Sequence, residues 1–368
     1  MEVVIKANDL LDHPGYSGVR LKVPATKEEI QEALDLARVS GDWYVVTKLV
    51  DWPLENDKRI QTCSMTLEEV NFLARKICNM NKQEVMQYKA SLEYRLQHKN
   101  LRQLSAMDLI NAAYQIDQFQ VLPGIQDDEK LGAYMRQKEG GFFADGCYCV
   151  KSVSGWEQVY DGRHLPLEEK ADMKSLLSVC LKKNGRHTDE AAVWVSCPAG
   201  PEEIRTAVLA LHAGSINECH IADVKCVVPH LMYVIDSSEC MEEVNALAER
   251  LGKMDAQSLL KMKAVLEYED CENLSHTMEL MEQMDRYSVD TRCISYANYG
   301  RSCLESTGID WRDPVFQNVD LEQYGKEQCR RAGMRLTPYG LVAKDKNPEE
   351  VQGEEQAKEA GMHMGGIG

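Results

Sequence analysis

The sequence predicts an α+β protein built as two tandem copies of one small unit. Two stretches, at residues 66–94 and 240–268, are identical at 13 of 29 ungapped positions and share Glu-Glu-Val-Asn and Leu-Glu-Tyr. A length of 368 residues also exceeds that of one typical domain. We expect each copy to be a small α/β unit followed by a helical hairpin or bundle and a short α/β end, in an elongated molecule.

The α/β part of each copy is predicted from short segments in which apolar and polar residues alternate, the period of a half-buried strand. These segments are VRLKV at 19–23, WYVVTKLVDW at 43–52, AVWVS at 192–196 and CHIADVKCVV at 219–228. A helix is expected between the two strands of each copy. Thr26 and Glu29 form a capping-box pattern at the start of the first helix, and Gly200 with Pro201 begins the second.

The repeated stretch is predicted to form a helical hairpin. Val244, Leu247, Ala248 and Leu251 recur at the spacing of one helical face. Gly252 can end this helix, and Asp255 can cap a second helix that runs to Tyr268. Each copy then closes in a glycine-containing turn and a strand-like end, GGFFADGCYCV in the first and RLTPYGLVA in the second, and the second copy carries an insertion of about twenty residues before its end.

These patterns divide the chain into four parts. Residues 1–150 form the first copy, 151–186 a connector with one helix from about Leu167 to Leu181, and 187–343 the second copy. Residues 344–368 are charged and rich in glycine with few large apolar side chains, so we expect a disordered tail.

The charge lies almost entirely in the second half. Residues 1–186 hold 27 acidic and 25 basic side chains, a net charge of -2, whereas 187–368 hold 32 and 17, a net charge of -15. This balance argues against direct binding to nucleic acid or to an anionic membrane, because such proteins carry clustered Lys and Arg. An acidic protein should instead meet a basic or cation-bearing partner, or its charge only keeps it soluble.

The cysteines and the apolar runs predict a cytoplasmic protein. The 13 cysteines are scattered, and neither a secretory leader nor an apolar run long enough for a membrane span is visible. No nucleotide-binding or hydrolase motif is present, which lowers the expectation of an enzyme. His212, Cys219, His220, Cys226 and His230 could suggest zinc, but their spacing fits no compact ligand pair, and we expect no metal there.

The segment that follows the hairpin is the strongest functional signal. From Ala264 to Asp285 the chain contains seven carboxylates and no Lys or Arg, and the corresponding part of the first copy is basic. Glu279, Glu282 and Asp285 would form a strip on one helix, spaced by about 5 to 6 Å. The structural interpretation is that these carboxylates form a solvated helix face without a binding role. The functional interpretation is a surface that imitates the regularly spaced phosphates of DNA.

At these residues the second copy resembles the ArdA-type antirestriction proteins. The resemblance rests on the entry CPAGPEEI, the helix EEVNALAERL with the LEY helix after it, and the late DLEQYGK with TPYGLV. It covers 187–343 well and 18–150 more faintly. It implies a cytoplasmic DNA mimic of mobile elements that occupies the DNA groove of a type I restriction-modification enzyme, without cofactor or turnover.

The resemblance also implies which residues imitate phosphates and how the protein assembles. A homodimer, or the tandem copies acting as a pseudo-dimer, would supply the full surface. The alternative is a protein of a mobile element that binds its partner without mimicry, through a face containing Met278, Met281 and Met284 or through the neutral first copy. The partner-binding carboxylates are expected to be Glu242, Glu243, Glu249, Glu267, Glu269, Asp270, Glu272, Glu279, Glu282, Asp285, Asp320 and Glu322.

Overall fold

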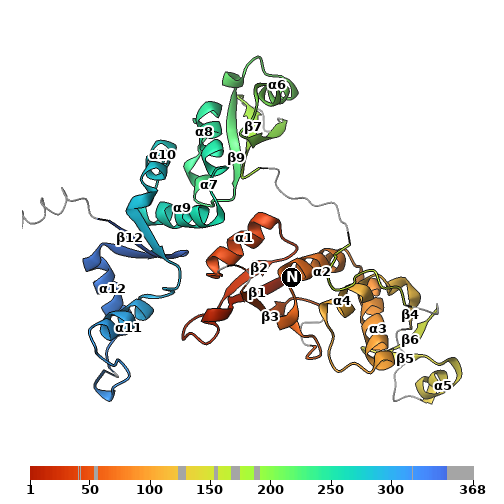
Figure 1. Cartoon of the computed structure of the whole chain (residues 1–368). Coiled ribbons are helices and arrows are strands. Elements are labelled where there is room, and N and C mark those ends of the chain that lie inside the picture. The colour runs from red at the N-terminus through yellow and green to blue at the C-terminus, as the bar shows by residue number, and fades with distance from the viewer. Residues whose placement is uncertain are drawn as a thin grey trace, which may run out of the picture. The chain divides into compact units, whose positions relative to one another are not determined.

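The protein is described by a computed structural model that divides into two compact units. Unit 1 comprises Met1–Met173 and unit 2 comprises Lys174–Gly368. Both contain helices and small antiparallel sheets, so the α+β prediction is confirmed (Figure 1). The described residues are 1–39, 41, 43–53, 57–122, 130–152, 156–166, 175–185, 191–316 and 318–345.

Unit 1 consists of the strands of two sheets and the helices that connect these strands. In chain order they are β1 (Glu2–Ala7), β2 (Val19–Lys22), α1 (Lys27–Leu36), β3 (Tyr44–Val50), α2 (Leu67–Cys78), α3 (Lys82–Lys99), α4 (Ala106–Ala113), β4 (Phe119–Leu122), α5 (Lys130–Glu139), β5 (Phe142–Ala144) and β6 (Cys147–Lys151). A single turn of 3-10 helix, η3 (Ile116–Gln118), joins α4 to β4.

Unit 2 repeats this order with additional helices. Its elements are β7 (Leu177–Lys183), β8 (Ala192–Cys197), α6 (Pro201–Ala210), β9 (Cys219–Cys226), α7 (Leu231–Val234), α8 (Met241–Leu251), α9 (Ala256–Glu269), α10 (Leu274–Glu282), η5 (Met284–Arg286), β10 (Tyr287–Asp290), α11 (Tyr296–Ser306), α12 (Leu321–Ala332), β11 (Met334–Thr337) and β12 (Gly340–Lys344). Helix α11 lies in the insertion expected from the sequence.

The described residues of each unit form two three-stranded sheets, and the strand orders agree between the units. The first sheet has the order β2-β1-β3 in unit 1 and β8-β7-β9 in unit 2, and the second has β4-β6-β5 and β10-β12-β11. The central strands β1 and β7 both shift register against their third strand, between Val4 and Ile5 and between Cys180 and Leu181. The two units therefore agree in the pairing of their strands as well as in the order of their helices.

The repeated Glu-Glu-Val-Asn has a structural explanation. The side chain of Asn71 on α2 accepts from the amide of Ala25 at 2.7 Å and donates to its carbonyl at 2.8 Å. Asn245 on α8 makes the same two bonds with Ala199, at 2.8 and 3.0 Å. Each asparagine satisfies the backbone just before α1 or α6, where an unpaired polar group would cost stability. The shared residues thus maintain the fold.

The core of unit 1 lies between its first sheet and helices α2 to α4. Val3 and Ile5 of β1 are fully buried with Val70 of α2 and Ile110 of α4. Helix α3 also lies beside the second sheet (Figure 1), where Ala90 and Phe119 belong to a smaller buried cluster. One long helix therefore joins both sheets of the unit.

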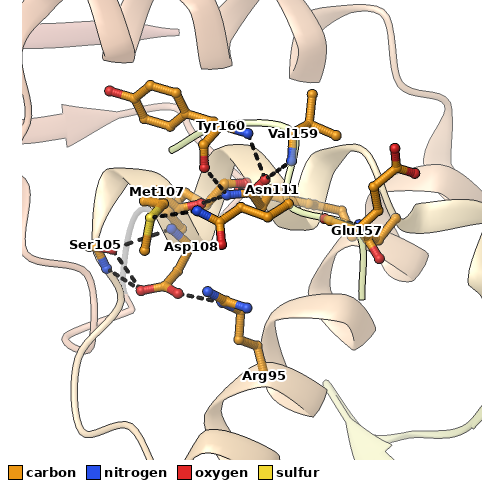
Figure 2. A network of polar contacts seen from close by, with 12 residues as sticks. Arg95, Ser105, Met107, Asp108, Asn111, Glu157, Val159 and Tyr160 are labelled. Carbon is orange, nitrogen blue, oxygen red and sulfur yellow. Dashed lines mark hydrogen bonds and ion pairs between the residues drawn. The ribbon is translucent and has the colours of Figure 1, made fainter. Parts of the chain in front are cut away.

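Unit 1 also contains a segment that returns across its helices after β6. This segment, residues 156–166, is called the strap here. Trp156, Tyr160 and Leu165 of the strap pack against the core. Asn111 of α4 lies beneath the strap and binds the backbone of Val159 and Tyr160, while Asp108 one turn earlier binds Ser105 and Arg95 (Figure 2).

Two predictions from the sequence are wrong, and the first concerns the connector helix. The sequence predicts a connector helix that reaches Leu181, but Leu177–Lys183 is the central strand of a sheet. Five consecutive residues of this strand, Leu177 to Leu181, are buried, and a short apolar run of this kind does not distinguish a buried strand from a buried helix. Residues 167–174 of the expected helix, and 346–368 of the expected disordered tail, lie outside the described residues.

The other correction concerns the acidic strip. Helix α10 ends at Glu282, and Asp285 lies in the separate 3-10 turn η5. The three carboxylates are therefore not on one continuous α-helix.

Within the part of the chain that the structure describes, none of the helices combines the length and apolar character that crossing a bilayer requires.

Candidate partner-binding surface

The acidic residues of unit 2 are positioned by three helices, α8, α9 and α10. The side chains of Val244, Leu247 and Leu251 are completely buried and fix which face of α8 points inward. Asp255 caps α9 by accepting from the amide of Ser258, as predicted, and Asn273 caps α10 by accepting from His276. The carboxylates on the opposite faces consequently point to solvent.

Between α8 and η5, six of the predicted carboxylates are exposed and form no ion pair among the described residues. Three belong to α8, one precedes α10, one lies on α10 and one on η5: Glu242, Glu243, Glu249, Glu272, Glu279 and Asp285. Their negative charge is available to a partner.

The carboxylates at the end of α9 are instead neutralised by the last strands of the unit. Arg335 of β11 donates to both oxygens of Asp270, at 2.7 and 3.2 Å. Lys344 of β12 donates to Glu269 at 2.8 Å, and the hydroxyl of Tyr287 donates to the same carboxylate oxygen at 2.6 Å. These two carboxylates tie α9 to the second sheet.

Two more predicted carboxylates have basic neighbours within the helical region. Arg250 of α8 donates to Glu282 of α10 at 3.0 Å and to the carbonyl of Met278 at 3.2 Å. The Nδ1 of His230 lies 3.3 Å from Glu267. The run of carboxylates without Lys or Arg in the sequence is therefore partly compensated by bases that come from elsewhere in the chain.

The last two predicted carboxylates have local roles at α12. Asp320 caps the helix by accepting from the amide of Gln323 at 2.9 Å, and Glu322 accepts from the amide of Ala297 at 2.7 Å. Helices α11 and α12 cross so closely that a side chain at Gly325 would collide with the carbonyl of Tyr296. Glu322 thus joins α12 to α11, and Asp320 stabilises the start of α12.

One further acidic residue, outside the twelve predicted ones, belongs to this region. Burial raises the pKa of Glu239, and a hydrogen bond and charge repulsion from Glu243 raise it further. Glu239 thus extends the carboxylates at the start of α8 toward the preceding loop, where Asp236 is also exposed. The density of acidic residues in DSSECMEE is the signal in the sequence that could have shown this.

The pKa of Glu269 predicts a measurable dependence on pH. Burial alone would raise this pKa, but the bonds from Lys344 and Tyr287 outweigh burial and hold it below its usual value. A lowered pKa in the folded state stabilises the fold above the unfolded pKa of about 4.3, and this contribution is lost as the pH falls through the folded pKa.

We expect Lys344→Met to remove this contribution, because burial would then dominate and raise the pKa of Glu269. Unit 2 should lose about 1 to 2 kcal/mol of stability at pH 7, and less of its stability should then depend on pH between 3 and 6. Thermal unfolding across this range measures both effects. Lys326→Met, at an exposed position on α12, is the matched control, and identical pH profiles for the two variants would contradict the assignment.

The residues considered for zinc are separated in the structure. The side chain of His220 contacts Asn184, and His230 contacts Glu267 and the carbonyl of Cys271. In the described part of the chain no group of three or more His, Cys, Asp or Glu side chains is arranged to hold a metal ion.

Comparison with known families bears directly on this surface. Residues 184–343 match the family described as Antirestriction protein (ArdA). The matched segment contains α8, α9 and α10 with all twelve predicted carboxylates, and it ends within β12. A search of curated proteins finds no match.

Residues 184–343 are therefore similar to the ArdA antirestriction proteins, which confirms the resemblance for this segment.

Proposed function

We propose that this protein is an antirestriction protein that acts as a DNA mimic. Unit 2 occupies the DNA-binding groove of a type I restriction-modification enzyme, or a related defence enzyme, and inhibits it by competition. The family match over residues 184–343 carries the proposal, and the six exposed carboxylates support the mechanism. No step requires a cofactor or turnover.

The spacing of the exposed carboxylates supports mimicry. Glu242 and Glu249 lie two turns apart on α8, about 10 Å along the helix axis. Duplex DNA presents one charge per about 1.7 Å of axis, so a single helix imitates selected phosphates rather than all of them. Carboxylates from α8, α10 and η5 together offer a basic groove more contacts than one helix could.

We propose that unit 1 is a diverged copy of the same fold. The equal strand orders and the matching asparagine bonds of α2 and α8 support this proposal. Its near-neutral charge indicates that it contributes less electrostatic mimicry. The two units could act as a pseudo-dimer, or two chains as a homodimer.

Competition with DNA tests the proposed function. The full chain should displace a duplex oligonucleotide from the methyltransferase core of a type I enzyme, and its affinity for that core should fall steeply between 50 and 200 mM salt, because charged contacts are screened. Binding to the core without displacement of the oligonucleotide would rule out mimicry.

A partner that binds without mimicry is the alternative. The adjacent Met232 and Tyr233 on α7 are exposed, and 83% of the Tyr233 surface is accessible to solvent, which favours an apolar contact. Met278, Met281 and Met284 are each half-buried. Apolar burial does not depend on screened charge, so an affinity that survives 0.5 M salt would favour this alternative.

A further inference from the structure

The strap shows how one face of this fold binds an extended polypeptide. Asn111 of α4 accepts from the amides of Val159 and Tyr160, at 2.7 and 2.9 Å, and donates to the carbonyl of Tyr160 at 2.8 Å. Gln115 donates to the carbonyl of Glu157. Asn111 of α4 and Gln115 just after the helix thus bind the backbone of the strap, as a sheet edge would bind a strand. Figure 2 shows Asn111 beside Val159 and Tyr160.

A carboxylate of α2 completes this face. Glu69 accepts from the hydroxyl of Tyr160 at 2.8 Å, and its other oxygen accepts from the amide of Thr66 at the start of the helix. Tyr160 is 3% exposed and Asn111 is fully buried. The strap is therefore seated in the face that α2 and α4 form together.

Unit 2 carries a corresponding face on α8 and α10. The repeat places Glu243 where unit 1 has Glu69. Gln115 directly precedes η3 and Gln283 directly precedes η5, and counting back one turn from each places Glu279 at the position of Asn111.

A second pair of contacts supports this alignment of the two faces. Lys76 of α2 lies over the ring of Tyr114 at the end of α4, 4.8 Å from its centre. The corresponding residues of unit 2, Arg250 and Glu282, also meet, as an ion pair between α8 and α10. The same two positions therefore join the same two helices in both units.

Within the described residues, no segment covers the face in unit 2, and this face is more acidic. Glu243, Glu279 and Gln283 are all exposed, whereas Glu69, Asn111 and Gln115 are buried beneath the strap. Glu279 occupies the position that Asn111 has in unit 1. Its carboxylate keeps the hydrogen-bond acceptor and adds a negative charge. An occupant that offers amide donors and cationic side chains would form charge-assisted hydrogen bonds there.

We propose that the face formed by α8 and α10 in unit 2 binds an extended segment with Lys or Arg side chains, contributed by the partner protein. Glu243 and Glu279 accept hydrogen bonds from the cationic side chains or the backbone amides of the segment, and Gln283 binds its backbone as Gln115 does in unit 1. The identity of the partner as a restriction enzyme rests on the proposed function. The chemistry of the face is independent of the proposed function.

A peptide that copies the strap tests this proposal without any enzyme. The probe is residues 155–162 with Glu157→Lys and Asp161→Lys, and the control peptide has the native sequence. The lysine peptide, titrated into the full chain, should slow amide hydrogen exchange in α8 and α10. It should bind at least about tenfold more tightly than the native peptide, because the carboxylates of the face attract its lysines and repel the acidic residues of the native peptide.

Variants of the protein locate the binding face. Glu279→Asn, which installs the residue of unit 1, should weaken the lysine peptide about tenfold, and Glu202→Gln on the exposed surface of α6 should leave it unchanged. Equal binding of the two peptides, protection outside α8 and α10, or no binding at all would overturn the proposal. Competition with DNA that persists while the peptide fails to bind would reject the peptide-binding face alone, and the reverse result would reject only the proposed function.

Discussion

Replacement of both Glu242 and Asp285 by lysine is expected to weaken the binding of this protein to a type I methyltransferase core by about 100-fold, or about 2.7 kcal/mol. Both side chains are exposed on unit 2. Each substitution removes an attraction to the basic groove and adds a repulsion, and like charges placed opposite one another cost several kcal/mol at an interface. Displacement of a labelled duplex, measured at low salt, quantifies the loss.

The corresponding positions of unit 1 provide a matched control for this prediction. Glu68 and Asp117 occupy the same positions in unit 1 and are also exposed. The variant Glu68→Lys with Asp117→Lys changes the net charge by the same amount, so it separates a local contact from the overall field of the protein. We expect a loss of less than about fivefold for this control, because screening weakens distant charges. Equal losses in both variants would show that only the net charge matters.

Asp108→Ala is expected to lower the free energy of unfolding of unit 1 by about 3 to 5 kcal/mol, the usual cost of breaking a buried ion pair from one side. Arg95 and Asp108 are 3% and 6% exposed and are hydrogen-bonded to each other. Burial alone would raise the pKa of Asp108, but bonds from Ser105 and Arg95 hold it below its usual value. The contribution of this pair is therefore present above the unfolded pKa of about 3.9 and lost as the pH falls through the folded pKa.

The strap should loosen in the same variant. Arg95 lies under the ring of Trp156, 4.6 Å from its centre, so a displaced Arg95 would remove a contact of the strap. Amide exchange of α4 and the strap, followed by mass spectrometry, measures both effects. The double variant Arg95→Met with Asp108→Leu should recover most of the stability, because an apolar pair needs no compensating charge. Normal exchange in Asp108→Ala would contradict the predicted role of the pair.

Periodicity predicts much of the fold and misses the central strands. The hairpin of α8 and α9 is visible because Val244 and Leu247 recur at helical spacing and Asp255 provides a cap. Strand β1 has three consecutive apolar residues in EVVIKA, where β2 alternates strictly, and it is absent from the predicted strands although its burial alternates in the structure. Strand β7 falls in a predicted helix, because Leu177 to Leu181 are buried without alternation.

The candidate surface is predictable in composition but not in pairing. The sequence shows that carboxylates gather between Glu267 and Asp285, and it does not show that Arg335 and Lys344 return to two of them. These ion pairs join residues 65 and 75 positions apart, a separation at which only the folded chain decides which side chains meet. The family resemblance, in contrast, is visible in local order and is confirmed over 184–343.

Among the described residues, the strap covers a face of unit 1 and the corresponding face of unit 2 is exposed, which has a consequence for competition. Trp156 follows the end of β6 at Lys151 by five positions, and a segment held by so short a tether has an effective concentration of about millimolar or higher at its own binding face. A free ligand of equal intrinsic affinity would have to exceed that concentration to displace it. At low concentrations of ligand, a chain with two similar faces should therefore behave as monovalent, with α8 and α10 as the accessible site.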